Sequence, residues 1–131
     1  MHQTPLSILL IEDDEFMASL IRFTLERQHM RVTCVADGQE ALLILTETPS
    51  FDAVLLDWLM PQVSGFEVLV QLKQSHAWKA IPVMMLSAVD DGQQIARAFQ
   101  EGASDYVTKP FNPQELLARL MRFIPQSRVG A

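Results

Sequence analysis

The feature that most constrains the fold of this chain is a regular alternation of short apolar runs with patterns of helical spacing. Each run is four to six residues long and bounded by turn signals, which is typical of a buried strand. The runs lie at 6–11, 31–35, 53–57, 83–87 and 105–108. Because strand and helix alternate five times, the chain is predicted to be an α/β protein. Its parallel sheet should be covered on both faces, with right-handed crossovers.

Helices are predicted after each of these strands, and several have recognisable ends. They are expected at 15 to about 28, 39 to about 46, 65 to about 72, between 92 and 102, and at 113–124. Asp37 and Asn112 are candidate N-caps, and Gly102 is a candidate C-terminal cap. Asp14 and Glu15 suit the positive end of a helix dipole, and we assign them that structural role.

Composition narrows the range of functions. At 131 residues the chain is expected to form one domain over 1–125, with 126–131 as a tail or the start of a linker. A net charge of −6 argues against nucleic-acid binding by this segment. No apolar run approaches the ~20 residues of a membrane span. The single cysteine, Cys34, excludes an internal disulfide, suits a cytoplasmic location and is interpreted as a small core residue.

One carboxylate lies where an acid is unusual. The apolar run that starts at Ala53 ends in Asp57, and Met60-Pro61 then turns the chain away. A helix-capping role is disfavoured, because the residues after Asp57 do not begin a helix. In an open α/β sheet, the carboxyl ends of the strands form the edge where ligands bind. Asp57 is therefore a candidate functional residue.

Other polar residues follow the remaining strands. Glu12 and Asp13 come after the first strand, Ser87 ends the fourth, and Lys109 follows the fifth. Taken singly, these are ordinary helix-start acids, a turn serine and a solvated lysine. Their joint placement predicts a cluster with Asp57 at one edge of the sheet. Three carboxylates so close should raise one pKa unless a cation joins them, and Mg²⁺ suits such oxygen ligands.

This cluster has the parts needed for phosphoryl transfer. Lys109 supplies a positive charge, the Ser87 hydroxyl supplies a donor, and a cation would neutralise phosphoryl oxygens. The chemistry that the cluster favours is attack by the Asp57 carboxylate on phosphorus, which gives an acyl phosphate.

Four sequence pieces carry a resemblance to a known family. They are ILLIEDD at 8–14, LDWLMP at 56–61, LSA at 86–88 and DYVTKPF at 105–111. Together they resemble the receiver domains of two-component response regulators, over about 6–124. The resemblance implies a flavodoxin-like five-stranded sheet of order 2-1-3-4-5. It also implies that Asp57 accepts phosphate from a sensor histidine kinase, a phosphotransfer protein or a small phosphodonor. Such a domain is no enzyme beyond its own phosphorylation and dephosphorylation.

The resemblance also implies a Mg²⁺ site. Asp13, Asp57 and the backbone carbonyl of Leu59 would bind the ion directly, and Glu12 would help through water. Many relatives have Asp at the position of Glu12, and we expect this variant to be tolerated.

The remaining roles concern the phosphoryl group and a switch. Lys109 would pair with the phosphoryl group, next to a Lys109–Pro110 bond that resembles the cis peptide of the family. Ser87 and Tyr106 resemble the switch pair, in which the hydroxyl moves toward phosphate and the ring turns inward. Ser87 replaces the more frequent Thr and lacks its methyl group, which changes the packing of the switch.

The C-terminal part resembles the receivers of winged-helix transcription factors. In that subfamily the face made by the fourth helix, fifth strand and fifth helix forms a homodimer through charged pairs. Asp105, Glu115 and Arg119 are candidates for three of these positions, but Ile95 stands where a basic partner for Glu115 is expected. The 131 residues leave no room for an output domain, so a stand-alone receiver and a piece of a longer protein both remain open.

Three alternative functions were weighed. A flavodoxin-like redox protein needs a loop rich in Ser, Thr and Gly after the first strand, where this chain has acids. A haloacid-dehalogenase-type phosphatase needs a second Asp two residues after Asp57, where this chain has Leu59. The main alternative is a degenerate receiver that acts as a docking module without phosphorylation.

Overall fold

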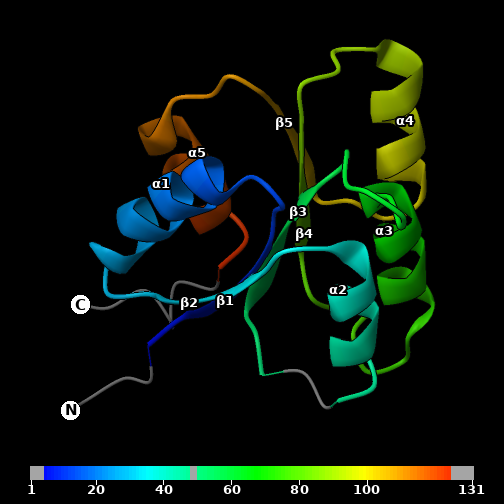
Figure 1. The fold of residues 1–131 in the computed structure, drawn as a ribbon, viewed down its shortest axis with the longest axis horizontal. Coiled ribbons are helices and arrows are strands. Elements are labelled where there is room, and N and C mark those ends of the chain that lie inside the picture. The colour runs from blue at the N-terminus through cyan, green and yellow to red at the C-terminus, as the bar shows by residue number, and fades with distance from the viewer. Residues whose placement is uncertain (1–4, 48–49, 125–131) are drawn as a thin grey trace.

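The structure is a computed structural model that describes residues 5–47 and 50–124. These residues form one parallel five-stranded sheet and five helices (Figure 1). The strands are β1 (Ser7–Ile11), β2 (Arg31–Val35), β3 (Ala53–Asp57), β4 (Val83–Ser87) and β5 (Asp105–Thr108). The helices are α1 (Glu15–Glu26), α2 (Gly38–Ile44), α3 (Gly65–Gln74), α4 (Gly92–Gln100) and α5 (Pro113–Met121). The strand order is β2-β1-β3-β4-β5, which confirms the expected fold class.

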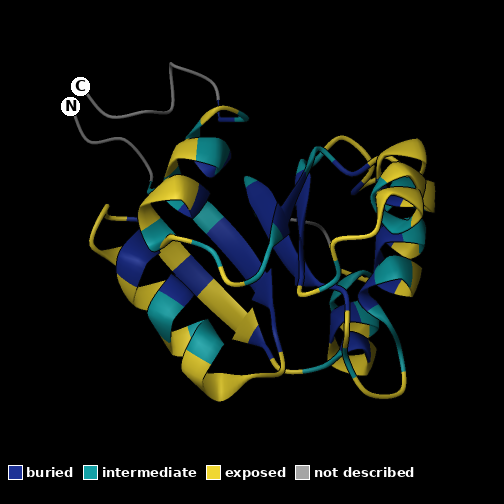
Figure 2. Cartoon of the chain, turned by 90° about the horizontal axis from the view of Figure 1, so that it is seen from above, coloured by how far each residue is buried: buried dark blue, intermediate teal, exposed yellow. Residues whose placement is uncertain are grey.

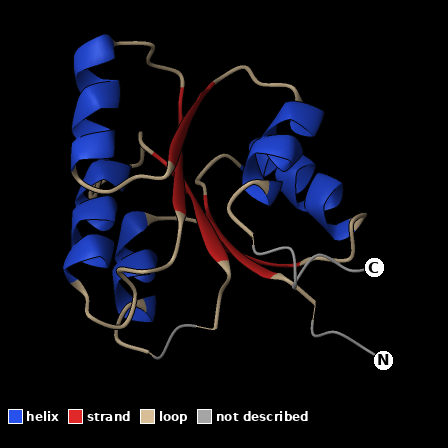
Figure 3. Cartoon of the chain, turned by 180° about the vertical axis from the view of Figure 1, so that it is seen from behind, coloured by secondary structure: helices blue, strands red, loops and turns tan. Residues whose placement is uncertain are grey.

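The helices cover the two faces of the sheet unequally. Helices α1 and α5 lie on one face, and α2, α3 and α4 lie on the other (Figures 1 and 3). Alternate residues of a strand point to opposite faces, so Ile8 and Leu10 of β1 pack toward α1 and α5. Leu9 and Ile11 pack into the opposite cluster. Because helices cover both faces, every residue of β3 and β4 is buried, as their apolar runs predicted.

The edge strand β2 is less buried than the sequence suggested. It pairs with β1 alone, and its residues alternate irregularly between buried and exposed (Figure 2). Cys34 is exposed, so its interpretation as a core residue is wrong. As the edge strand, β2 has a neighbouring strand on one side only. Val32 is buried in the cluster with α1 and α5, whereas Cys34 of the same strand is exposed. Partial burial raises the pKa of the Cys34 thiol and Arg22 partly opposes this, which disfavours the reactive thiolate.

The predicted caps are present. Asp37 and Asn112 each accept a hydrogen bond from a backbone N–H in the first turn of α2 and α5. Asp14, assigned only a role at the helix dipole, also caps α1 by accepting from the Met17 N–H. Gly102 has φ of 105°, the left-handed geometry that ends α4. Three helices end earlier than expected: α1 at Glu26, α2 at Ile44 and α5 at Met121. The predicted helix end at Pro125 and the tail at 126–131 lie outside the described residues.

The loop after α3 contributes to the core. Trp78 lies in the loop between α3 and β4, and its side chain is completely buried there. Its indole Nε1 donates a hydrogen bond to the Glu47 carbonyl at 3.1 Å, and the ring lies beside Phe51. The loop after α3 therefore packs against the segment that connects α2 to β3. None of the described helices is long and apolar enough to span a membrane.

Candidate functional site

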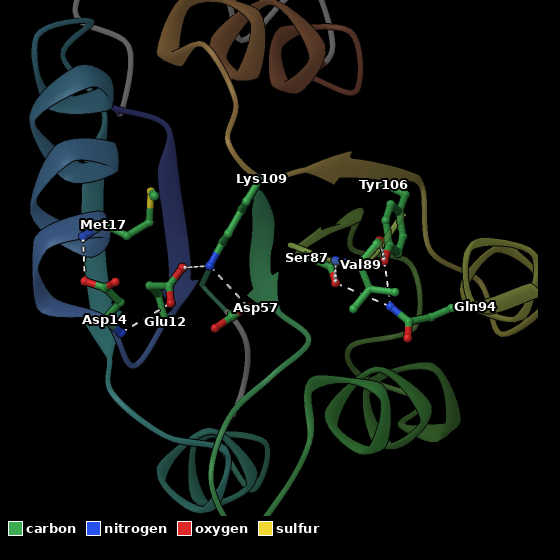
Figure 4. A network of polar contacts seen from close by, with 9 residues as sticks. All are labelled: Glu12, Asp14, Met17, Asp57, Ser87, Val89, Gln94, Tyr106 and Lys109. Carbon is green, nitrogen blue, oxygen red and sulfur yellow. Dashed lines mark hydrogen bonds and ion pairs between the residues drawn. The ribbon is translucent and has the colours of Figure 1, made fainter. Parts of the chain in front are cut away.

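The carboxyl edge of the sheet brings the predicted site residues together (Figure 4). In the register of β3 and β4, Asp57 lies opposite Leu86, and in that of β4 and β5, Ser87 lies opposite Thr108. Asp57 and Ser87 therefore end neighbouring strands. Glu12 follows β1 and continues its pairing, with its N–H donating to the Val35 carbonyl at 3.0 Å.

Three acids form the centre of the site. Carboxylate oxygens of Glu12, Asp13 and Asp57 all lie within 4.8 Å of one another. Glu12 is 3% exposed and Asp57 is 4% exposed, whereas Asp13 faces solvent. Glu12 also accepts a hydrogen bond from the backbone N–H of Asp14 at 3.3 Å, which fixes the carboxylate beside the start of α1. The cluster is thus buried at Glu12 and Asp57 and open to solvent at Asp13.

Lys109 crosses the site and contacts two of these acids. Its Nζ lies 2.8 Å from Glu12 Oε1 and 3.3 Å from Asp57 Oδ1. The peptide bond between Lys109 and Pro110 is cis, as the resemblance implied. Burial lowers the pKa of Lys109, but the hydrogen bond to Glu12 and the charges of Asp57 and Glu12 outweigh it, so the pKa is raised. Lys109 therefore stays charged.

The environment of Asp57 disfavours its charged form. Burial is the largest cause, followed by the hydrogen bond and charge of Glu12, and together they raise the pKa of Asp57 to about 7. Lys109 acts in the opposite direction and does not compensate. The sequence predicted that one pKa would rise in such a cluster, and the direction is confirmed.

The donor set fits a divalent cation. Three carboxylates face one ammonium group, so the site carries an excess of negative charge. Carboxylate oxygens with an open, solvent-facing side are the ligands that Mg²⁺ takes in proteins. The raised pKa of Asp57 is the mark of acids that lack such a counter-charge. A bound Mg²⁺ would supply this charge and would also neutralise phosphoryl oxygens.

Ser87 and Tyr106 take part in one hydrogen-bonded network. Ser87 is completely buried, and its Oγ accepts from the Val89 N–H at 3.0 Å and from Gln94 Nε2 at 3.3 Å. The Tyr106 ring is turned inward and is 7% exposed. Its hydroxyl donates to the Val89 carbonyl at 2.8 Å and accepts from Gln94 Nε2 at 2.7 Å. Sequence reasoning missed Gln94, because a Gln in the first turns of a helix resembles any solvated residue.

A close contact of α3 with β3 fixes the loop that follows Asp57. The Gly65 N–H donates to the Trp58 carbonyl at 2.8 Å, and the Ser64 hydroxyl caps the helix by accepting from the Glu67 N–H. A Cβ on Gly65 would overlap the carbonyl oxygen of Asp57 and lie 2.8 Å from Trp58 Cα. The sequence indicated a helix start at Gly65 but not this contact with Asp57.

The candidate dimer residues pair within the chain. Arg119 Nη1 lies 3.0 and 3.1 Å from the two carboxylate oxygens of Asp105. Its Nε lies 3.2 Å from Glu115 Oε1. Ile95 is partly buried and packs against the core cluster on its side of the sheet. The charges that a dimer would use are thus already satisfied by intramolecular partners.

A family model and curated relatives match most of the chain. The model, described as a response regulator receiver domain, matches residues 8–121. The alkaline phosphatase synthesis transcriptional regulatory protein PhoP of Bacillus subtilis is 36% identical over 124 residues, which are 95% of this chain and 50% of that protein. The chain spans about half the length of the first curated relatives it matches, including the phosphate regulon regulators PhoB.

Solved structures agree in fold. The chemotaxis protein CheY4 of Vibrio cholerae superposes with a TM-score of 0.85 at 28% identity, over 92% of this chain and all of that chain. The receiver domain of the sensor histidine kinase PA1611 of Pseudomonas aeruginosa superposes with a TM-score of 0.82 at 29% identity, covering 92% of this chain and 98% of that one. That structure holds a magnesium ion in its active site cleft.

Proposed function

The chain belongs to the response regulator receiver domain family, and from this premise we propose that Asp57 accepts a phosphoryl group in a Mg²⁺-dependent reaction. The observation that carries the proposal is the position of Asp57 between the acids Glu12 and Asp13 and the ammonium group of Lys109. A buried carboxylate with cation ligands on one side and a fixed positive charge on the other is equipped to attack phosphorus.

Each residue has a definite task in this reaction. Asp13, Asp57 and the Leu59 carbonyl would hold the metal, with Glu12 acting through water, and the charge of the metal would stabilise the phosphoryl oxygens. One oxygen of Asp57 forms the new bond to phosphorus. The bond from phosphorus to the donor imidazole breaks, and its electron pair leaves with that nitrogen. Lys109 is near enough to Asp57 to pair with the transferred group.

The protonation state of Asp57 makes the reaction depend on the cation. With a pKa of about 7, a large fraction of Asp57 carries a proton at neutral pH and cannot attack phosphorus. A divalent cation beside the carboxylate favours its charged form. The close placement of three acids thus makes the reactivity of Asp57 depend on a bound cation.

The phosphoryl group would come from a sensor histidine kinase or a phosphotransfer protein. We place this exchange in the cytoplasm, which an exposed, unpaired Cys34 thiol suits. The added charge would then favour one of two arrangements of Ser87 and Tyr106 and alter the face formed by α4, β5 and α5. Dimerisation through that face is part of the proposal, and Asp105, Glu115 and Arg119 are its candidate residues.

The test is the intact mass of the protein after treatment with acetyl phosphate. We expect a gain of one phosphoryl mass that requires Mg²⁺ and is absent in Asp57→Asn. Asp52→Asn is a matched control, because Asp52 binds the Ser7 N–H at the opposite end of the sheet. Equal phosphorylation of the parent and the Asp57→Asn variant would contradict the assignment.

One observation favours a second function, a docking module that works without phosphorylation. The Tyr106 ring is turned inward, and its hydroxyl is hydrogen-bonded to the Val89 carbonyl and to Gln94 rather than to the acid cluster. A partner protein that recognises only the inward position of this ring could bind the unmodified chain. If a captured partner bound equally well with and without beryllofluoride, a mimic of the phosphoryl group, this alternative would replace the first proposal.

A further inference from the structure

We propose that Gln94 is a positioning residue that restrains the Ser87 hydroxyl and the Tyr106 phenol at the same time. It holds Ser87 on the α4 side of the site, away from Asp57, until a phosphoryl group competes for the hydroxyl. This inference rests on the proposed function, because the competing group is the one on Asp57. It concerns a residue that contacts neither the acids nor Lys109.

The geometry is a closed ring of four residues (Figure 4). Gln94 Nε2 donates to Tyr106 Oη at 2.7 Å and to Ser87 Oγ at 3.3 Å. Tyr106 Oη donates to the Val89 carbonyl at 2.8 Å, and the Val89 N–H donates to Ser87 Oγ at 3.0 Å. A side-chain amide nitrogen carries two hydrogens, so both donors of Gln94 are used.

Because these hydroxyls are buried, breaking one of their hydrogen bonds costs free energy unless a new partner replaces it. Ser87 is fully buried and Tyr106 nearly so, whereas Gln94 is half-buried at the start of α4. Buried hydroxyls keep partners, and in the described part of the chain no buried side-chain nitrogen or oxygen lacks one. The Ser87 hydroxyl can therefore move away from Gln94 only when another hydrogen bond holds it in the new position. The phosphoryl oxygens on Asp57 would supply that bond by accepting the Ser87 O–H, and the movement toward them would stretch the bond that Gln94 donates.

The two bonds of Gln94 have opposite consequences for the switch. The longer bond, to Ser87, opposes the movement of the hydroxyl toward phosphate. The shorter bond, to Tyr106, supports the inward position of the ring. Because the bond to Ser87 is the longer one, it should open first, and Tyr106 would stay in place. Gln94 thus sets the interaction free energy that the phosphoryl group must supply before the Ser87 hydroxyl moves toward it.

The first test uses the unmodified chain. Gln94→Met keeps the length of the side chain and removes both donors, and Gln93→Met makes the same change at the exposed neighbouring position. Tyr106 is the only tyrosine of the sequence, so 3-fluorotyrosine gives a single fluorine resonance. We expect that resonance to shift and broaden in Gln94→Met and to stay unchanged in Gln93→Met. Identical spectra for the two variants would overturn the proposal without bearing on phosphorylation.

The second test measures beryllofluoride affinity with Mg²⁺ present. In a Tyr106→Phe background only the bond to Ser87 remains, and Gln94→Met should tighten binding by roughly two- to ten-fold, the size of one neutral hydrogen bond. In a Ser87→Ala background the same change should not tighten binding. No tightening in the first background, or equal tightening in both, overturns the inference. Failure of the parent to bind beryllofluoride at all would instead count against the proposed function.

Discussion

At the scale of single residues, the salt bridge between Lys109 and Glu12 is the contact on which the site most depends. The Glu12 side chain is completely buried, and Lys109 Nζ is its partner at 2.8 Å. Lys109→Met would leave that charge unpaired, so we expect a loss of about 3 kcal/mol in the free energy of unfolding. Urea unfolding of the parent and the variant near neutral pH, without divalent cations, measures this loss.

A control variant and added Mg²⁺ test whether the loss comes from the unpaired acid. Lys79→Met changes an exposed lysine and should alter stability by less than about 0.5 kcal/mol. Millimolar Mg²⁺ should recover part of the loss in Lys109→Met, because a cation among the acids replaces the missing charge. A Lys109→Met variant as stable as the parent would contradict the prediction.

The raised pKa of Asp57 predicts how stability depends on pH without divalent cations. Asp57 keeps its proton to about pH 7 in the folded chain, whereas the ordinary pKa is 3.8. Between these values the folded state binds the extra proton, so the contribution of Asp57 to stability is complete below about pH 4 and is lost as pH rises toward 7. The contribution of Asp57 has a limiting slope of ~1.4 kcal/mol per pH unit.

The measurement is the difference between the parent and Asp57→Asn in urea unfolding across this pH range. The difference should grow in favour of Asp57→Asn as pH rises and should shrink when Mg²⁺ is added. A difference that is constant across the range would mean that Asp57 is ionised throughout.

How much of the site could be predicted depended on the residue type. Asp57, Glu12 and Lys109 were found because charged residues at strand exits are unusual in an apolar context. Gln94 could not be found, because its role depends on the distance between α4 and β5, which no local pattern encodes. Cys34 was misplaced because β-forming neighbours do not show that a strand lies at the edge of the sheet.

At the scale of elements, the contact of α3 with the end of β3 predicts a strong effect of one methyl group. In Gly65→Ala the new Cβ would overlap the Asp57 carbonyl, so α3 or the loop must move. We expect a loss of more than about 2 kcal/mol in stability, together with weaker Mg²⁺ binding, since the shift reaches Asp57 itself.

Gly92→Ala is the matched control for that prediction. Gly92 occupies the first position of α4, as Gly65 does in α3, and a Cβ there meets nothing within 4 Å. The same substitution should be neutral or stabilising by about 0.5 kcal/mol. Urea unfolding and Mg²⁺ titration of the two variants side by side make the comparison. Equal effects would show that the contact of Gly65 is not restrictive.

The elements themselves were largely predictable, and their ends were not. Strands β3 and β4 are buried on both faces, so their apolar runs had one interpretation. Helix α1 ends at Glu26 because the chain turns at His29, which has φ of 64°, and no Gly or Pro announces that turn. Trp78 showed no periodicity with its neighbours, because it fills a gap between α2 and the sheet rather than one face of a helix.

At the scale of the whole molecule, the α4, β5 and α5 face predicts how the chain associates. Arg119 is committed to Asp105 and Glu115 within the chain, and Ile95 offers Glu115 no positive partner. The exposed pair with Glu115 contributes little, and the bonds to the partly buried Asp105 already exist within the chain, so exchange of these pairs between two chains would gain little. We expect the unmodified chain to sediment as a monomer at micromolar concentration.

Beryllofluoride with Mg²⁺ should promote whatever dimer this face supports, and Arg119→Glu should abolish it. Arg22→Glu is a control on α1, because Arg22 forms a similar exposed pair with Glu26 on another face. A stable dimer of the unmodified parent, or a beryllofluoride dimer that survives Arg119→Glu, would place the contact elsewhere.

The contact between Lys109 and Glu12 joins residues 97 positions apart in the sequence. The proposed phosphoryl-accepting centre therefore draws on the first and the last strand, and no fragment that lacks either strand contains it. Contacts of such long range form late, since the loop between them must close first. A chain that has not finished folding, or has lost either end of the sheet, cannot assemble the centre. If the proposed function holds, only a chain whose whole sheet has folded could receive the phosphoryl group.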